Sequence, residues 1–155
     1  MERAEHRRGR RSRLEALGLL GVLALGGCAA QATQTFDVSR EVALPAEQLK
    51  FENINPAIKM ATAWGDKGKG AHGTFGTFPP NFITPFHIHT GAYHGVVLKG
   101  VMTNPFSGEK DPPKMGPGSY WYVPAKSVHA TACVSSTPCE FYFHAESAFD
   151  FQVVK

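Results

Sequence analysis

Hydrophobic and β-branched residues occur in short runs from Phe36 onward, with breaks at glycine, proline or asparagine about every eight to twelve residues. Such runs are typical of half-buried strands. After residue 30 the sequence has no extended helical periodicity, and only Ala46–Phe51 could form one helical turn. The expected strands are Lys59–Trp64, His72–Phe78, Pro85–His89, Tyr93–Thr103, Ser119–Val123, Val128–Val134, Glu140–His144 and Phe149–Val153. This spacing predicts an all-β sandwich or barrel.

The N-terminal end follows a different pattern. A basic stretch runs to Arg13, the apolar run Leu17–Leu25 follows, and small residues surround Cys28. The apolar run is about half as long as a membrane-spanning helix, so it is typical of a signal peptide. The sequence Leu25-Gly26-Gly27-Cys28 resembles the bacterial lipobox, in which the cysteine is lipidated and becomes the mature N-terminus. The alternative is ordinary signal-peptidase cleavage near Ala29, which would discard Cys28.

The lipobox divides the chain into a signal peptide at 1–27, a tether at 28–35 and one folded domain at 36–155. A chain of 155 residues is long enough for one domain and short for two. We therefore expect an exported protein of the cell envelope or periplasm, anchored in a membrane by lipid. Ala29 resembles the residue that sorts lipoproteins to the outer membrane. Arg10–Leu14 resembles a twin-arginine export signal without its usual apolar pair, so the export route stays open.

Positive charge is concentrated in the leader. Residues 1–27 hold six of the 16 basic residues and three of the 13 acidic ones, so ten of each remain from Cys28 onward. The net charge of +3 and the isoelectric point of 8.8 therefore do not describe the folded part. A neutral domain without a stripe of lysine and arginine is a poor nucleic-acid binder, and we exclude nucleic acid as a partner.

The two remaining cysteines, Cys133 and Cys139, flank a turn-rich segment between two predicted strands. At the base of a hairpin their sulfurs would lie close enough to bond, and an exported protein meets an oxidising compartment. We predict a disulfide here. It would close a short loop, so its entropic stabilisation would be modest. Two inert buried thiols are the alternative.

Three histidines fall within eight residues: His87, His89 and His94. Residues two apart in a strand point to the same face, so His87 and His89 present two imidazoles that one metal ion can bridge. A histidine pair alone is weak evidence, because solvated and core pairs are common. His72 and His144 lie apart from this group, and we expect each on the surface or at the rim of the barrel.

The sequence around the pair resembles the two conserved blocks of the cupin superfamily. The matched positions are His87, His89 and Gly100 in the first block and Gly118, Pro124 and His129 in the second. The resemblance implies a single cupin β-barrel, jelly-roll-like, built from two antiparallel sheets. It also implies that His87, His89 and His129 are metal ligands.

The chain departs from the cupin pattern at two glycine positions. Asn81 stands at the leading glycine of the first block, and Lys126 stands where the second block often has glycine. A turn that needs a positive φ would be strained by lysine. We therefore expect the turn at Lys126 to differ in detail.

The acidic ligand of the family is also missing. Counting forward from His89 puts His94 at that position, whereas counting back from Gly100 puts Tyr93 there. Imidazole is a far better metal ligand than a neutral phenol. An inward His94 would also place Val96 and Leu98 inward, which gives the barrel a more apolar lining. We therefore favour His94 as the fourth ligand and leave Tyr93 open.

Histidine ligands suit iron, zinc, manganese, nickel or copper, so the residues do not identify the divalent ion. The carboxylate-free site resembles that of iron cupin dioxygenases, in which the substrate chelates the metal. We predict a metal-dependent enzyme, with dioxygenase chemistry as one candidate, that acts on a small molecule in the cell envelope. A non-catalytic module that binds or senses a small ligand is the alternative, as is a vestigial pocket without metal. Assembly as a homodimer is left open.

Replacing Cys28 by serine should move the protein from the membrane fraction to the soluble envelope fraction, because lipidation requires the thiol. Immunoblots of the two fractions would measure the shift. A Cys28→Ser form that fractionates like the parent would contradict the lipoprotein prediction.

Overall fold

The computed structural model describes residues 39–155. The predicted signal peptide, Cys28 and the tether at 28–35 lie outside the described residues. Within 39–155 no helix is long and apolar enough to cross a membrane. One short 3-10 helix, η1, spans Ala46–Gln48, and the remaining regular structure is strand. The predicted all-β class is confirmed.

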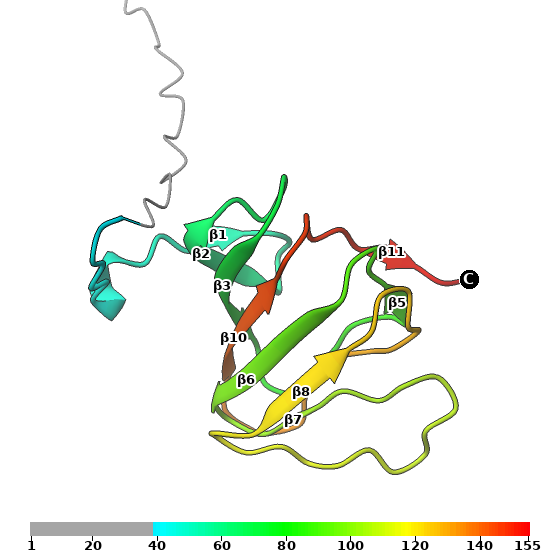
Figure 1. The fold of residues 1–155 in the computed structure, drawn as a ribbon. Coiled ribbons are helices and arrows are strands. Elements are labelled where there is room, and N and C mark those ends of the chain that lie inside the picture. Colours follow the sequence, from blue (N-terminus) through cyan, green and yellow to red (C-terminus); the bar gives the residue numbers. More distant parts are fainter. Residues whose placement is uncertain (1–38) are drawn as a thin grey trace, which may run out of the picture. The chain divides into compact units, whose positions relative to one another are not determined.

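Strands in the described part of the chain form three antiparallel sheets (Figure 1). The large sheet contains, in spatial order, β1 Glu52–Asn53, β2 Lys59–Gly65, β3 His72–Phe78, β10 Cys139–Ala145, β6 Tyr93–Lys99 and β8 Tyr120–Val123. A second sheet contains β4 Phe82–Ile83, β9 Ala132–Cys133 and β7 Met102–Thr103. The third is the pair formed by β11 Gln152–Val153 and β5 His87–Ile88.

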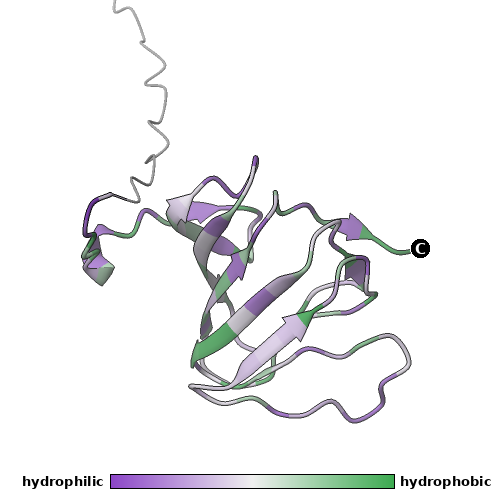
Figure 2. Cartoon of the chain, in the orientation of Figure 1, coloured by the Kyte–Doolittle hydropathy of each residue, from purple (hydrophilic) through white to green (hydrophobic). Residues whose placement is uncertain are grey.

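The large sheet buries one face and exposes the other. β10 buries Phe141 and Phe143, and β8 buries Trp121 while it exposes Tyr120 and Tyr122. This alternation is the period-two pattern of a sheet with one face in the core. Figure 2 shows hydrophobic and hydrophilic positions mixed along β3, β6 and β10. The buried face forms the core that the candidate site adjoins.

Several strands are shorter than the sequence predicts: Pro85–His89 contributes only β5, and Phe149–Val153 only β11. The expected strand Tyr93–Thr103 is interrupted at Gly100, whose φ of 78° turns the chain between β6 and β7. The expected strand Val128–Val134 contributes only β9. Its earlier part is irregular because His129 forms an isolated antiparallel bridge with His87.

Asn81 and Lys126 are the non-glycine residues with positive φ in the described part, at 53° and 62°. Both stand where the cupin pattern has glycine. The turn at Lys126 therefore keeps the left-handed conformation, and the expectation that it differs is wrong. The conformation costs roughly 1–2 kcal/mol for a residue other than glycine. A hydrogen bond from the Lys126 N–H to the His89 carbonyl, at 2.8 Å, offsets part of this cost.

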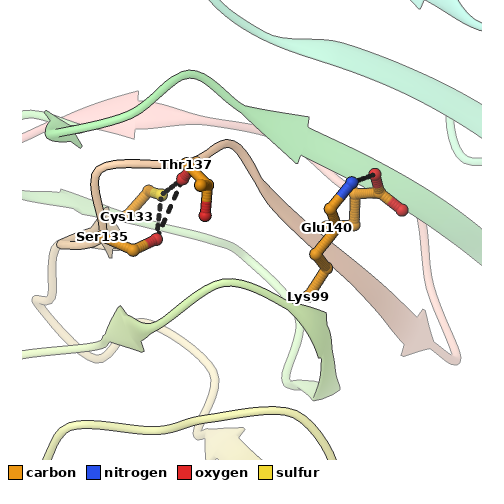
Figure 3. Close-up of polar contacts among 5 residues, drawn as sticks. All are labelled: Lys99, Cys133, Ser135, Thr137 and Glu140. Carbon is orange, nitrogen blue, oxygen red and sulfur yellow. Dashed lines mark hydrogen bonds and ion pairs between the residues drawn. The ribbon is translucent and has the colours of Figure 1, made fainter.

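Cys133 and Cys139 form the predicted disulfide, with their Cα atoms 5.7 Å apart. They do not lie at the base of a hairpin: Cys133 ends β9 of the second sheet, and Cys139 begins β10 of the large sheet. The disulfide therefore joins two sheets. Within the loop that it closes, the Ser135 hydroxyl donates to the Thr137 carbonyl at 2.9 Å (Figure 3).

Removing the disulfide should destabilise the domain, because the covalent bond restricts the unfolded chain. For a sequence separation of 6, loop-closure entropy corresponds to about 2 kcal/mol. The double variant Cys133→Ser, Cys139→Ser should lose about this free energy of unfolding, measured with urea. Intact mass should rise by two hydrogen atoms on reduction. Two freely alkylated thiols in the native protein would contradict the disulfide.

Candidate metal centre

His87 and His129 face each other across a short antiparallel contact. The His87 N–H donates to the His129 carbonyl at 2.8 Å, and the His129 N–H donates to the His87 carbonyl at 3.0 Å. Directly opposed residues of antiparallel segments place their side chains on the same face. The two imidazole centroids consequently lie 4.3 Å apart.

His89 completes the cluster from the same face of the chain, two positions after His87. The Nε2 atoms of His87 and His89 are 3.1 Å apart. One ligand nitrogen from each of His87, His89 and His129 lies within 4.8 Å of the others. All three residues are at most 3 % exposed. The structure therefore brings together three of the four histidines that the sequence analysis proposed as ligands.

A backbone carbonyl contacts the Nδ1 atom of each ring. The pairs are His87 with Pro85 at 2.8 Å, His129 with Ser127 at 2.9 Å, and His89 with Asp150. A carbonyl oxygen can only accept a hydrogen bond, so each Nδ1 carries the proton and donates it. Each Nε2 is left with a lone pair. Metal-binding histidines are oriented in this way.

Burial keeps the three rings neutral. Desolvation lowers the pKa of His87 and of His89 to about 4, well below the 6.5 of an exposed histidine, and repulsion from the neighbouring rings acts in the same direction. Desolvation also lowers the pKa of His129. At neutral pH the cluster is therefore in the uncharged form that binds metal ions.

The separation between the ring nitrogens of His87 and His89 fits a shared divalent ion. With the protons on Nδ1, the Nε2 lone pairs of His87 and His89 face each other at 3.1 Å, which is unfavourable without a shared cation. Metal–nitrogen bonds of about 2.0–2.1 Å correspond to about 2.9–3.4 Å between two ligand nitrogens. The observed separation lies in this range.

Tyr93, not His94, faces the cluster. Tyr93 is 4 % exposed, and its hydroxyl donates to the His129 Nε2 at 3.1 Å. His94 is exposed on the outer face of β6, where its Nδ1 contacts the Tyr120 hydroxyl. The expectation that His94 is a fourth ligand is therefore wrong. The register counted back from Gly100 is the correct one.

Packing explains why the apolar-lining argument for His94 failed. Gly95 takes the inward position after Tyr93, and a Cβ atom there would overlap the Trp121 indole. Trp121 of the neighbouring strand supplies the apolar surface that Gly95 lacks. Leu98, the apolar residue that was expected inward, is 44 % exposed.

The structure also corrects the placement expected for His72. This residue is fully buried on the inner face of β3, with its Nδ1 2.9 Å from the Thr74 hydroxyl. Desolvation lowers its pKa to about 4. His144 lies on the outer face, as expected for a surface position, with its Nε2 3.1 Å from the Glu146 carboxylate. Neither residue belongs to the cluster.

The C-terminal segment packs on two of the three histidines. The Phe149 ring stacks on His89 with the centroids 4.1 Å apart, and the Phe151 ring stacks on His87 at 4.0 Å. Asp150, between them, contributes its carbonyl to His89. The alternation of these three residues is visible in the sequence, but the histidines that they contact lie far away along the chain. The sequence analysis therefore missed their role.

A cavity of about 320 Å³ lies beside His87 and His89. Its lining includes five phenylalanines, Trp121 and Tyr93. Lys67 also lines the cavity, and no sequence motif pointed to it. The volume is at the lower end of the range for small-molecule sites. Two of the three histidines of the cluster therefore lie in the wall of a pocket that can admit a small molecule.

Three solved cupin-like structures illustrate what this fold resembles. The polyketide cyclase RemF from Streptomyces resistomycificus has a TM-score of 0.64 and 19 % identity, over 75 % of this chain and 87 % of that one. An RmlC-like cupin from Shewanella frigidimarina has a TM-score of 0.59 and 17 % identity, over 70 % and 93 %. KdgF from a Halomonas species has a TM-score of 0.57 and 13 % identity, over 68 % of this chain and 94 % of that one. At such identities the similarity shows the cupin fold alone, and the predicted fold is confirmed.

Comparison with curated proteins gave no match. A family model described as a domain of unknown function, DUF4437, matches residues 41–153. The match includes the three histidines, Tyr93 and the C-terminal segment. The chain therefore belongs to the DUF4437 family and folds as a cupin.

Proposed function

We propose that this protein is a metal-dependent enzyme that acts on a small molecule held in the cavity beside His87 and His89. One observation carries the proposal: three buried, neutral imidazoles place one ligand nitrogen each within 4.8 Å of the others, and two of them, His87 and His89, line an apolar pocket. Three protein ligands leave coordination positions open, which is typical of catalytic rather than structural sites. Iron, zinc, manganese, nickel and copper all suit these ligands.

A divalent ion at this position would supply Lewis-acid polarisation of a substrate oxygen, and redox chemistry where the ion is iron or copper. The residues of the chain set the conditions. Neutral ligands leave the charge of the ion uncompensated, so an oxygen anion would bind it strongly. Burial raises the pKa of Tyr93 to about 12, so its hydroxyl stays protonated and can donate a hydrogen bond at the site.

A non-catalytic binding or sensing module is the second candidate. Among the described residues that line the cavity there is no Asp or Glu, so the pocket offers no carboxylate as a general base. This favours retention of a ligand over proton transfer. Assays with enolic, thiol and catechol compounds would separate the two candidates. Conversion would support the enzyme, and saturable binding without conversion would support the module.

We also propose that the protein works in the cell envelope, anchored through lipid on Cys28. The support is the basic stretch, the apolar run and the lipobox of the leader. The disulfide is consistent with this compartment, because such bonds persist where conditions are oxidising.

Replacing His87, His89 or His129 by alanine should each remove most of the bound metal. Mutation of a residue that only hydrogen-bonds to a metal ligand already lowers metal affinity about 10- to 100-fold, so loss of a direct ligand should lower it at least as much. Elemental analysis of protein made without a histidine tag would measure the metal content. Bound metal at 100 times its dissociation constant should stabilise the fold by about 2.7 kcal/mol, and each variant should lose this gain.

His94→Ala is the matched control, because His94 belongs to the same stretch of sequence and points to solvent. It should retain both the metal and the thermal gain. If none of the cluster variants changed the metal content, the metal site would be refuted and only the fold would remain.

The metal-free protein should lose stability as the pH falls from about 6.5 toward about 4. Burial lowers the pKa of His72, His87 and His89 to about 4 in the folded state, whereas the unfolded chain protonates these residues near 6.5. The unfolded state therefore binds more protons in this window and is favoured by acid. Urea unfolding at pH 7 and pH 5 in the presence of chelator would measure the loss. His87→Asn should reduce the difference, and a pH-independent free energy would contradict the neutral buried cluster.

A further inference from the structure

The cavity lining in the described part of the chain carries a positive side chain and no negative one. Lys67 is the only residue among Lys, Arg, Asp and Glu that lines the cavity in the described part of the chain. No ion pair joins Lys67 to another described residue. The neighbouring carboxylate, Asp66, pairs instead with Lys69 at 3.0 Å. Lys67 therefore brings a positive charge to a pocket whose lining, among the described residues, has no negative charge.

A backbone hydrogen bond places Lys67 beside Phe149, whose ring stacks on His89. The Lys69 N–H donates to the Asp66 carbonyl at 3.0 Å, which fixes the turn that carries Lys67. The Lys67 carbonyl accepts a hydrogen bond from the Phe149 N–H at 2.8 Å, and the Phe149 ring stacks on His89. Figure 1 shows the β2–β3 loop and the segment between β10 and β11 at the same end of the large sheet. Lys67 and the histidine cluster thus share one region.

Aromatic rings form one part of the remaining cavity wall, beside aliphatic and small polar residues such as Ile58, Met60 and Thr131. Four of the five phenylalanines pack against one another edge to face or tilted, as Phe78 and Phe141 do with centroids 5.0 Å apart and Phe143 and Phe149 do at 4.6 Å. Phe151 stacks on His87 instead. Trp121 adds a further flat surface. Aromatic rings pack favourably on the faces and edges of other rings. This wall therefore suits a planar ring better than a flexible or polar molecule.

We propose that the cavity binds an aromatic carboxylate, with its ring among the phenyl groups and its anionic head between Lys67 and the ion held by the histidines. The inference rests on the proposed function, because the ion supplies the second positive charge. A neutral ring of the same shape would cover part of Lys67, a residue of intermediate exposure, without compensating its charge, and removing water from an uncompensated charge is costly.

Three probes of similar size separate the contributions of charge and ring: benzoate, its neutral analogue benzamide, and the non-planar anion cyclohexanecarboxylate. Trp121 lines the cavity, and the chain has two tryptophans. The variant Trp64→Phe keeps Trp121 alone, so its fluorescence reports binding in the cavity. Calorimetry on the wild-type chain gives the same affinities without that variant. In metal-loaded protein benzoate should bind at least about tenfold more tightly than benzamide, because charge-assisted contacts are worth this much. It should also bind more tightly than cyclohexanecarboxylate.

Lys67→Met should weaken benzoate binding about tenfold or more and leave benzamide binding unchanged. Lys69→Met is the matched control on the same turn, because Lys69 is paired and does not line the cavity. It should change neither affinity. Equal affinities for benzoate and benzamide, or a Lys67→Met protein that binds benzoate like the parent, would overturn the proposal. Preference for cyclohexanecarboxylate over benzoate would overturn the aromatic part.

Metal analysis distinguishes failure of the proposed anion site from failure of the proposed metal centre. Lys67→Met should keep its full metal content, because Lys67 is not a ligand. If the protein binds no metal but still shows a Lys67-dependent preference for benzoate, the anion site stands and the metal centre is refuted. If metal binds and the preference is absent, the metal centre stands and the anion site is refuted.

Discussion

The site depends on three hydrogen bonds from imidazole Nδ1 atoms to backbone carbonyl oxygens. They fix the proton on Nδ1 of each ring and so leave each Nε2 with a lone pair. The lone pairs of His87 and His89 face each other, and that of His129 accepts the Tyr93 hydroxyl. Without these bonds the rings could protonate or rotate to relieve the contact of 3.1 Å between His87 and His89. Burial supports the same arrangement, because a neutral imidazole is far less costly to bury than a charged one.

The carbonyls that accept these bonds come from chain segments that are not regular strand. Pro85, Ser127 and Asp150 each lie outside the sheets. In a continuous ladder their oxygens would bond to a neighbouring strand and would not be available to side chains. This is why the strands predicted at Pro85–His89 and Val128–Val134 are shorter in the structure. The left-handed turn at Lys126, just before His129, belongs to the same irregular region, and strain of this kind is common beside functional sites.

Local periodicity predicted most of the strands and placed His87 and His89 on the same face, because both follow from alternation along a strand. His129 could be joined to them only through the cupin resemblance, since nothing local encodes a partner forty residues away. The choice between Tyr93 and His94 shows where residue chemistry misleads. His94 was favoured because imidazole is the better metal ligand. The space beside the Trp121 ring admits only Gly95, however, and an inward Gly95 places Tyr93 inward and His94 outward. Contacts of Phe149 and Phe151 with the histidines are tertiary, and no sequence pattern specifies them.

The replacement of an acidic ligand by Tyr93 has an electrostatic consequence for the whole pocket. Cupins of the resembled pattern place a carboxylate beside the metal, which offsets part of its charge. Here the inward residue is a phenol that stays protonated, and the cavity lining within the described residues has no acid. A divalent ion in this pocket would therefore lack one negative charge from the protein. An anionic ligand can supply that charge, and the same ligand can compensate Lys67. Binding of the ion and of the anion should then strengthen each other by the same factor, because coupling between two sites is reciprocal.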